Sequence, residues 1–553
     1  MNKRLMMWVL LVMLTTSAPL AASAQALDIL ISGGSVYKHP AGTVVGIKQG
    51  KIAYLGSMDN AQSLIGEDTQ HIRAHGRALY PGFIELHGHL LDNVVFSRFA
   101  CLLEPEKGEL GREVCREVVD KLEEGQWLIG HGAGLLFKDL SPYSPRQWLD
   151  RYFPDVPVVI AEPHSSLVWA NTKAFELMMI NNYSIDPVGG KVLRDHNNEP
   201  TGVMLGAMAE LTMEQAWRSH RVRLCGLSEE YVMSVVPLES NGVTTLGDAG
   251  NFWLYGGINF WKHLDDEGVL KIRVSVRPRL SPYKAINEQL EGLRLIFRNE
   301  LTSRLIINQV SVQVDGNYGL KTARVSGRYQ PPYLNGEASG LFYFSPTELN
   351  AWLLRLSEIG YGAFFHAEGD EAIKAVLYSL ENVRNMNNDS RYTLSNMKFI
   401  HPDSERMLAR LDVATTFYEA EHHEIPVIRD NLIEQGLRPV SLRRLHAAGV
   451  SVSLSSESYG NEQVMPLRRI SEAMLDNQLG IASVNKAIDS YTIEPAKALG
   501  IDAITGSIVL GKSADLILLE QDLSKLAVED IASVKVLMTM LQGEITYRDE
   551  NRG

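Results

Sequence analysis

Two histidines separated by one glycine close an apolar run near the start of the chain. His87 and His89 end the stretch GFIELHGH, which begins after a proline at position 81. On a β-strand, residues i and i+2 point to the same side, so both imidazoles would face the same space. The chain has 15 histidines in 553 residues, and chance alone gives roughly 0.4 such pairs in a chain of this kind. The pair is therefore a candidate metal site only if distant parts of the chain supply further ligands.

Three further residues that suit a divalent metal end later apolar stretches. GYGAFFH ends in His366, NMKFIH ends in His401, and VSVSLSSE ends in Glu457. Imidazole nitrogens with one carboxylate suit Zn²⁺, and an open coordination position suits a bound water. A metal ion lowers the pKa of such a water and polarises a substrate carbonyl, while a carboxylate accepts the proton. The sequence therefore predicts a metal-dependent hydrolytic site, with zinc as the expected ion, formed by His87, His89, His366, His401 and Glu457.

These residues need a fold that brings distant strand ends together. The middle of the chain alternates short apolar strands, such as VTTLGD, LKIRVSVR, LIINQVSVQVDG and VATTFY, with helical patterns. In one helical stretch, SPTELNAWLLRLSEIG, Ser345 is a predicted N-cap and Gly360 a predicted stop signal. About eight strand–helix repeats predict an α/β fold of the (β/α)8 TIM-barrel type, whose active sites form at the carboxyl ends of the strands.

Segments with short β patterns flank this middle region. Alternating apolar runs separated by turn residues occupy about residues 27–80. Near the C-terminus, GSIVLGKSADLILLE and VLMTMLQGEITY show the same alternating apolar pattern. We therefore predict a small β-sandwich domain built from residues 25–80 and 495–553, with the barrel over 81–494. The stretch of about 92–240 is too long for one strand–helix loop, so we expect it to form an inserted subdomain.

The first 24 residues have the pattern of a secretory signal peptide. Lys3 and Arg4 precede an apolar run that is too short to span a bilayer, and Ala22-Ser23-Ala24 offers a small-x-small cleavage site. We expect cleavage near Ala24 and export, with the periplasm as the destination. An N-terminal membrane anchor is the alternative interpretation of the same run. No later segment approaches ~18 consecutive apolar residues, so we expect no membrane contact after cleavage.

Charge and cysteine content narrow the class of protein further. The formal net charge is −13, and removal of the first 24 residues with their two basic side chains makes it −15. This balance argues against nucleic acid or an anionic membrane as a partner and leaves a small-molecule substrate. Cys101, Cys115 and Cys225 are the only cysteines, so a disulfide scaffold is excluded. Cys101 and Cys115 could pair in an oxidising compartment.

Motifs spread over nearly the whole mature chain resemble one family. ALYPGFIELHGH, PTGVM, LESNGVTTLGDAG, HAEGDEAI, FIHPD and AAGVSVSLSSES occur in that order, followed by YTIEPAKALGI and GSIVLGKSADLILLE. In this combination the chain resembles the amidohydrolase superfamily, and within it the branch called amidohydrolase family 3. The resemblance implies a metal-dependent hydrolase of C–N bonds on a barrel with a β-sandwich. It assigns metal ligation to His87, His89, His366 and His401, and it places Glu457 where the family usually has an aspartate that acts as ligand and base.

Several positions depart from the pattern of that family. Glu85 stands where an aspartate usually precedes the two histidines, Ser311 stands at the position of a lysine that can bridge two metals, and Gly206 replaces an acidic residue. Because serine cannot supply the bridge, we expect one metal ion rather than two. The expected ligands are then His87, His89, His366 and Glu457, with His401 bonding substrate or water.

These observations lead to one main functional prediction and two alternatives. The main prediction is an exported, metal-dependent amidohydrolase that hydrolyses an amide or N-acyl bond through a metal-activated water. A deaminase or cyclic amidase at a mononuclear site is the first alternative, motivated by Ser311 and by Glu368 as a proton shuttle. The second alternative is a catalytically impaired, non-enzymatic exported binding protein on the same fold, motivated by the departures from the family pattern.

Overall fold

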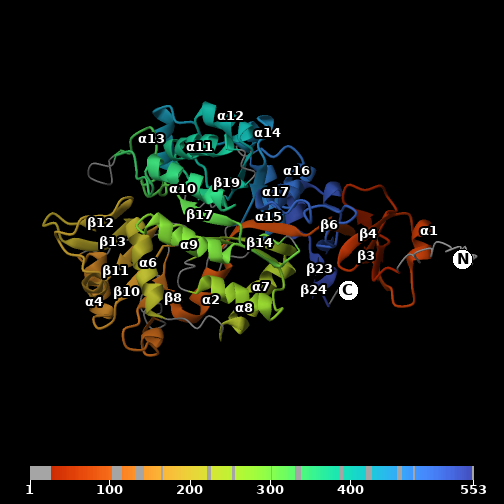
Figure 1. Ribbon diagram of the computed structural model, residues 1–553, viewed down its shortest axis with the longest axis horizontal. Helices are drawn as coiled ribbons and strands as arrows, with labels where there is room; N and C mark the ends of the chain where they lie inside the picture. Colours follow the sequence, from red (N-terminus) through yellow and green to blue (C-terminus); the bar gives the residue numbers. More distant parts are fainter. Residues whose placement is uncertain are drawn as a thin grey trace, which may run out of the picture.

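The computed structural model of the chain places secondary structure in a mixed α/β arrangement spread along one long axis (Figure 1). It describes residues 26–102, 115–132, 142–162, 166–220, 226–251, 256–300, 302–330, 338–386, 390–418, 426–456, 464–476 and 480–550. The predicted signal peptide at 1–24 and Glu457 lie outside these ranges. Within them, no helix has both the length and the apolar character needed to cross a membrane.

Nine parallel strands in two sheets form the centre of the fold; β16 and β17, separated by two residues, together hold the fourth position in chain order. In the first sheet β7 pairs with β14, β14 with β15, and β15 with the short β16; in the second, β17 to β21 pair in chain order. A parallel bridge between Arg279 and Ser311 links the two sheets. The strands are β7 (Phe83–Gly88), β14 (Val243–Asn251), β15 (Arg273–Pro278), β16 (Leu305–Ile306), β17 (Gln309–Gln313), β18 (Gly362–His366), β19 (Tyr392–Ser395), β20 (Val413–Phe417) and β21 (Val452–Leu454).

The parallel strands confirm the predicted α/β class, whereas a closed barrel stays a prediction because strand pairing shows two open sheets. One predicted strand is wrong. NMKFIH forms no named strand, and the sixth parallel strand is the preceding segment Tyr392–Ser395. Asn396 follows at once with φ +63°, a left-handed conformation that a regular strand does not contain. Phe399 retains only an isolated bridge to Pro439.

Helices follow the strands and pack their apolar faces against them, as the periodicity predicts (Figure 1). Ser345 caps the helix α10 as expected, because its hydroxyl accepts a hydrogen bond from the backbone N–H of Glu348 and the Glu348 side chain bonds back to the cap. The helices around the parallel strands include α2 (Leu90–Phe99), α7 (Ser228–Ser240), α8 (Gly257–Asp266), α9 (Ile286–Ile296), α10 (Pro346–Glu358), α11 (Asp370–Arg384), α12 (Pro402–Arg410), α13 (Pro426–Glu434), α14 (Leu442–Ala447), α15 (Pro466–Leu475), α16 (Val484–Asp489) and α17 (Ile493–Leu499).

The long stretch between β7 and β14 contributes a sheet of its own. Six strands pair in the order β12-β13-β11-β10-β9-β8 and lie with α4, α5 and α6 to one side of the parallel strands, at the lower left of Figure 1. Cys101 and Cys115 form a disulfide in this region, which realises the pairing considered from the sequence. The elements are β8 (Ala100–Leu102), β9 (Leu128–His131), α4 (Pro145–Tyr152), β10 (Val158–Ala161), β11 (Leu167–Ala170), α5 (Thr172–Leu177), β12 (Gly190–Arg194), β13 (Pro200–Gly206) and α6 (Ala207–Ser219).

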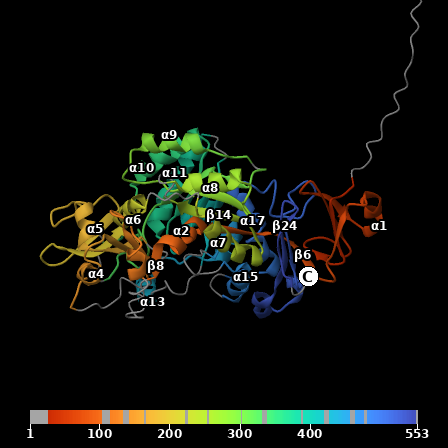
Figure 2. The same cartoon turned by 90° about the horizontal axis from the view of Figure 1, so that it is seen from below.

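Both ends of the described chain meet in two further sheets, on the right of Figures 1 and 2. One has the order β4-β3-β1-β5, and the other, β2-β6-β22-β23-β24, combines N-terminal and C-terminal strands. Ile31, Val45, Leu516 and Met538 belong to one buried cluster shared by the two sheets. The strands are β1 (Ile29–Ser32), β2 (Ser35–Val36), β3 (Val44–Lys48), β4 (Lys51–Gly56), β5 (Gln70–Arg73), β6 (Ala78–Pro81), β22 (Leu516–Leu519), β23 (Val536–Leu541) and β24 (Glu544–Arg548).

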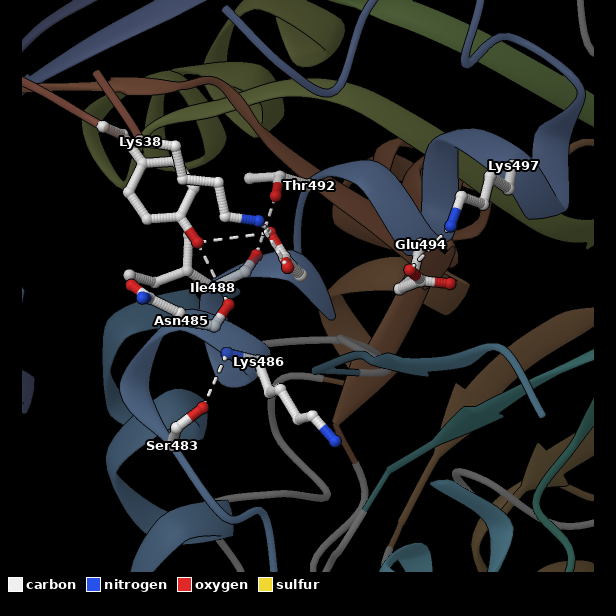
Figure 3. Close-up of polar contacts among 10 residues, drawn as sticks. Lys38, Ser483, Asn485, Lys486, Ile488, Thr492, Glu494 and Lys497 are labelled. Atoms are coloured by element: carbon white, nitrogen blue, oxygen red, sulfur yellow. Dashed lines mark hydrogen bonds and ion pairs between the residues drawn. The ribbon is translucent and has the colours of Figure 1, made fainter. Parts of the chain in front are cut away.

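Polar contacts fasten these terminal sheets to the parallel strands. The guanidinium of Arg273 on β15 lies 2.6 Å from the carboxylate of Asp515, and both side chains are buried. After β2, Lys38 reaches the helix α16, where its ammonium lies 2.7 Å from the Asp489 carboxylate (Figure 3). The Tyr37 hydroxyl donates to the carbonyl of Asn485 on the same helix. The terminal sheets are therefore fixed against β15 and α16.

Candidate active site

A cavity opens where the carboxyl ends of the parallel strands face helix α6, with an empty volume of about 1000 Å³ that includes its mouth. His89, His366 and Asn396 line it from the strand side. The opposite wall comes from α6 and the neighbouring strands β10 and β11, with Glu210, Met213, Trp217, Glu162 and Ser166. Clefts at the carboxyl ends of parallel strands are the usual location of active sites in α/β folds, so this cavity is the candidate site.

Three of the predicted histidines do gather at this place. The ring centroid of His87 lies 5.3 Å from that of His89 and 5.0 Å from that of His366. His87 is fully buried, while His89 and His366 are 8% and 6% exposed and line the cavity. Strand geometry explains the arrangement, because β7 and β18 both end here and deliver their last side chains to the same side.

Ser395, the last residue of β19, determines which nitrogen of His87 carries a proton. The Ser395 hydroxyl lies 2.9 Å from His87 Nδ1 and donates its single proton to Oδ1 of Asn396 at 3.0 Å. It can therefore only accept from His87, so Nδ1 carries the hydrogen and Nε2 keeps the lone pair. A histidine in this tautomer is suited to bind a metal through Nε2.

The opposite tautomer follows for His366. Its Nε2 lies 3.1 Å from the carbonyl oxygen of Ala249, which can only accept, and 3.1 Å from the Ser311 hydroxyl. Ser311 itself donates to the same carbonyl at 2.8 Å, so it accepts from the ring. Nε2 of His366 is therefore a donor, so the lone pair that could bind a metal is on Nδ1 of this ring. The serine at the predicted lysine position thus engages a predicted ligand.

Glu85 lies below the histidines and connects the first and last parallel strands. One carboxylate oxygen accepts from the backbone N–H of His87 at 3.1 Å, and the other accepts from the backbone N–H of Ser456 at 2.9 Å. Burial raises the pKa of Glu85 to about 8, against the two backbone hydrogen bonds that lower it. Glu85 therefore positions the ends of β7 and β21 and does not reach the cavity.

Two charged residues near the histidines were not singled out from the sequence. Asp248, buried near the end of β14, accepts from the backbone N–H of Leu91, and burial raises its pKa to about 6. Arg277, buried near the end of β15, donates to the carbonyl of Leu86, and burial lowers its pKa to about 9. The signal that could have found them is their position near the ends of VTTLGD and LKIRVSVR, the same criterion that selected the histidines.

Glu368 is held rigidly at the edge of the cavity. Its carboxylate accepts from the side-chain amide of Asn317 at 2.9 Å and from the backbone N–H of Tyr318 at 2.8 Å. Its own backbone N–H donates to the buried Asp315, whose pKa burial raises well above its ordinary value. Fixed by these bonds, Glu368 is placed to receive a hydrogen bond from a bound molecule but not to swing through the site.

The wall opposite the histidines carries a polar cluster that sequence reasoning missed. Arg279, which follows β15, lies 3.3 Å from the carboxylate of the buried Glu210 on α6. One turn further along α6, Glu214 contacts the Tyr283 hydroxyl and the Lys284 ammonium. Burial raises the pKa of Glu210 despite the nearby guanidinium. These contacts join α6 to the segment after β15 across the cavity.

The structure does not bring His401 to the other three histidines. His401 ends the segment NMKFIH, which forms no named strand, and it is the N-cap of α12. Its Nδ1 accepts a hydrogen bond from the backbone N–H of Asp403 at 3.2 Å. Its side chain is 55% exposed, and it does not line the cavity. Glu457 lies outside the described residues.

The donor types fit one divalent ion better than two. His87, His89 and His366 supply imidazole nitrogens close to one another, and Ser311 supplies no bridging group. Over the part of the chain that the structure describes, no three His, Cys, Asp or Glu side chains converge on a common point that could hold a metal. Glu457, which lies outside the described residues, is the predicted carboxylate ligand beside these histidines.

Comparison with known proteins identifies related enzymes that agree with a hydrolytic site. The sequence pattern described as "Amidohydrolase family" matches residues 70–547. The chain is 25% identical over 533 residues to the N-substituted formamide deformylase of Arthrobacter pascens, covering 91% of this chain and 94% of that protein. It is 23% identical to the protein LONG AFTER FAR-RED 3 of Arabidopsis thaliana, covering 98% and 94% of the two chains.

Solved structures share the fold. An uncharacterized metal-dependent hydrolase from Pyrococcus horikoshii OT3 is similar with a TM-score of 0.64 and 21% identity, covering 91% of this chain and 99% of that chain. A zinc-bound adenosine deaminase from Xanthomonas campestris has a TM-score of 0.51 and 11% identity, covering 94% and 93%. Because the family pattern spans most of the sequence, the chain belongs to the amidohydrolase family of metal-dependent hydrolases that act on carbon–nitrogen bonds, as its motifs predicted.

Proposed function

We propose that this protein is an exported hydrolase that cleaves an amide or N-acyl C–N bond in a small molecule. The observation that carries the proposal is the cavity lined by His89 and His366 at the carboxyl ends of parallel strands. In the reaction, a water oxygen bonds to the carbonyl carbon, the C–N bond breaks, and a proton passes to the leaving nitrogen. The periplasm is the proposed location, based on the signal-peptide pattern of residues 1–24.

The proposed architecture completes the described sheets. With the short β16 and the following β17 taken as one strand, the nine parallel strands become the eight of one (β/α)8 barrel over residues 81–494, with the insert at about 92–240 and a β-sandwich from 25–80 and 495–553. The Arg279–Ser311 bridge joins the sheets on one side, and the Glu85 contact with Ser456 joins β7 to β21 on the other. Barrel closure would place all the strand ends around one cavity.

For the metal centre we propose one divalent ion, most readily zinc, with His87, His89 and His366 as ligands and Glu457 as the fourth. Such an ion supplies a Lewis acid for the substrate carbonyl. The residues of the chain perform the remaining tasks. Ser395 holds the His87 ring in the ligating tautomer, Glu368 offers a fixed acceptor, and Trp217 and Met213 exclude water from the inner wall.

The test combines metal content with product analysis. The purified mature protein should contain about one equivalent of zinc or a similar ion, and a His87→Ala/His89→Ala double variant should lose it. Incubation with N-formyl and N-acyl amines should release the free amine, and the double variant should be inactive. Release of ammonia from heterocycles instead of amines from acyl amides would favour the deaminase alternative. Neither metal nor turnover in the wild type would refute the proposal.

A non-catalytic exported binding protein is the second candidate. Ser311 favours it, because the serine stands where the family pattern has a lysine that can bridge two metals, and its hydroxyl lies 3.1 Å from Nε2 of His366 instead of supplying a bridging group. Under this function a ligand of the cavity would bind and be recovered chemically unchanged. Mass spectrometry of the ligand after prolonged incubation therefore separates the two candidates.

A further inference from the structure

The cavity of the candidate site has two chemically different walls. Every described side chain that lines it from the parallel strands and the segments after them is polar or charged, including His89 and Asn396. The insert between β7 and β14 forms the other wall, where Glu162, Ser166 and Glu210 are the polar members. The remaining residues of this second wall are apolar, namely Ala161, Leu167, Val168, Ala209, Met213 and Trp217. A molecule in the cavity therefore meets polar groups on one side and hydrocarbon on the other.

Two neighbouring strands of the insert form one part of the apolar wall. β10 and β11 pair in antiparallel fashion, with Ala161 directly opposite Val168. Opposed residues of an antiparallel pair point to the same face of the sheet, so these two side chains form one apolar surface. Both line the cavity, and their exposed fractions are only 6% and 2%. The strand pair thus gives the cavity a largely dry inner surface.

Helix α6 forms the rest of the apolar wall with one of its faces. Ala209, Met213 and Trp217 follow one another at intervals of four residues, which places them on the same side of the helix. All three belong to the same buried cluster as Ala161 and Val168. Met213 adds a flexible, polarisable thioether, a group that contacts aromatic rings favourably. The helix face and the strand pair are therefore one continuous apolar surface.

Ion pairs hold this wall in place opposite the histidines. The carboxylate of Glu210, the residue after Ala209, lies 3.3 Å from the Arg279 guanidinium. One turn further along α6, Glu214 contacts the ammonium of Lys284. Both cations belong to the segment after β15, so α6 is fastened to the parallel strands at two successive turns. A surface fixed in this way binds an apolar group without the entropic cost of ordering the surface first.

We propose that the apolar wall binds an apolar substituent of the substrate, such as a phenyl group, while the C–N bond lies at the polar wall near His89 and His366. The substrate class is then an amide with one aromatic or similarly bulky apolar group. This inference rests on the proposed function for the reacting bond, but binding of the apolar group is independent of turnover. The group belongs to the acyl side or to the nitrogen side of the bond, and two isomeric amides distinguish these cases.

The binding test uses two ketones, which have no C–N bond to hydrolyse. 5-Phenyl-2-pentanone is N-phenethylacetamide with a methylene group in place of the N–H, and 2-pentanone lacks only its phenyl ring. Ligand-observed NMR titration of the full-length mature protein should show at least about tenfold tighter binding of the phenyl ketone, because burial of a ring removes a large apolar area from water. Equal affinity of the two ketones would overturn the inference.

Two methionines of α6 provide matched variants that locate the bound ring. Met213→Gln keeps the length of the side chain but places an amide in the apolar wall, so it should weaken binding of the phenyl ketone at least about fivefold and change 2-pentanone little. Met208→Gln is the control, because Met208 lies on the same helix and in the same buried cluster but is not among the described residues that line the cavity. It should keep the phenyl preference.

A second variant covers the case in which Met213→Gln does not fold. Val168→Thr places a hydroxyl in the same wall with almost no change of shape, and it carries the same expectation. An equal loss of phenyl preference in the wall variant and in Met208→Gln would overturn the inference, because the ring would then not be bound at this wall.

The turnover test compares N-phenethylacetamide and its isomer N-methyl-3-phenylpropanamide with N-ethylacetamide, which has no ring. Hydrolysis of the first gives acetate and phenethylamine, and hydrolysis of the second gives 3-phenylpropionate and methylamine. The better of the two isomers should exceed N-ethylacetamide at least about tenfold in kcat/KM, and Met213→Gln should remove most of this advantage. The preferred isomer shows which side of the bond carries the apolar group. Equal kcat/KM for all three amides would overturn the inference, whereas a phenyl preference in binding without turnover would refute the proposed hydrolase and keep this inference.

Discussion

The hydroxyl of Ser395 lies 2.9 Å from Nδ1 of His87, across 308 positions of sequence. The contact connects the sixth parallel strand with the first and places the lone pair of the His87 ring on Nε2. Ser311 makes the reverse contact with Nε2 of His366. Two serines on parallel strands thus favour opposite tautomers of two histidines, with the lone pair on Nε2 of His87 and on Nδ1 of His366.

Removal of the Ser395 hydroxyl should weaken metal binding. Ser395→Ala leaves the ring of His87 without its fixed tautomer, and loss of a residue that orients a metal ligand typically costs about 10–100-fold in affinity. Competition with a chromogenic zinc chelator measures the change. Ser395→Thr keeps a hydroxyl at the same position and should stay close to the wild type. An unchanged zinc affinity in Ser395→Ala would show that this contact does not orient a ligand.

The histidines should differ in their effect on metal content. His89→Gln and His366→Gln should each lower bound metal well below one equivalent, because a His366 ring that donates through Nε2 to Ala249 keeps its lone pair on Nδ1. His401→Ala should keep the metal, since that side chain is 55% exposed at the start of α12. Atomic absorption on dialysed protein gives the content of each variant. Metal loss in His401→Ala equal to that in His89→Gln would contradict the separation of His401 from the other three histidines.

The fold could be predicted where local pattern and tertiary packing agree. Ser345 and Glu348 form the capping box at the predicted helix start, and the alternation of strands and helices gave the α/β class. The pattern failed at NMKFIH, although Met397, Phe399 and Ile400 are all buried. Burial of apolar side chains can be satisfied by an irregular segment, and the left-handed Asn396 that ends β19 has no strong signal in a single sequence.

Those residues of the candidate site that lie at the ends of strands could be predicted from the sequence. His87, His89 and His366 were found by that criterion alone, and it would also have found Asp248. The contacts that decide their chemistry were not predictable, because Ser311 is 55 residues from His366 and Ser395 is far from His87 in the sequence. The hydrogen-bonding role of a serine depends on which acceptor receives its proton, and this requires the neighbouring strand in place.

Loss of the Glu85 carboxylate should destabilise the protein and disturb the site together. Glu85→Ala leaves the buried N–H groups of His87 and Ser456 without their acceptor, which costs about 1–3 kcal/mol for each group. The thermal midpoint should fall clearly, and metal affinity should fall with it. Glu85→Gln retains one carbonyl acceptor and should lose less than half as much. Equal stability of Glu85→Ala and the wild type would show that the link between β7 and β21 is dispensable.

The buried pair of Arg273 and Asp515 should be sensitive to the loss of one partner and tolerant of the loss of both. Asp515→Ala leaves a buried guanidinium uncompensated, at a cost of about 3–5 kcal/mol, whereas Arg273→Met/Asp515→Leu should recover most of the stability. Thermal unfolding of the two variants gives the comparison. A double variant as unstable as Asp515→Ala would show that the contact between β15 and the terminal sheets depends on the ion pair itself. It would exclude an uncompensated buried charge as the cause of the instability of Asp515→Ala.

Glu239 should make stability depend on pH in a region remote from the site. This residue near the end of α7 is 5% exposed, and burial raises its pKa to about 7. Because the folded pKa is above the unfolded value, the folded state binds the extra proton. The carboxyl therefore does not lower the free energy of unfolding below about pH 4, and it lowers it by the full amount above about pH 7. Once solvent screening is allowed for, this cost is on the order of 1 kcal/mol. Glu239→Gln should raise the thermal midpoint at pH 8 and leave it unchanged at pH 4, so an equal shift at both pH values would exclude titration of this carboxyl as the cause.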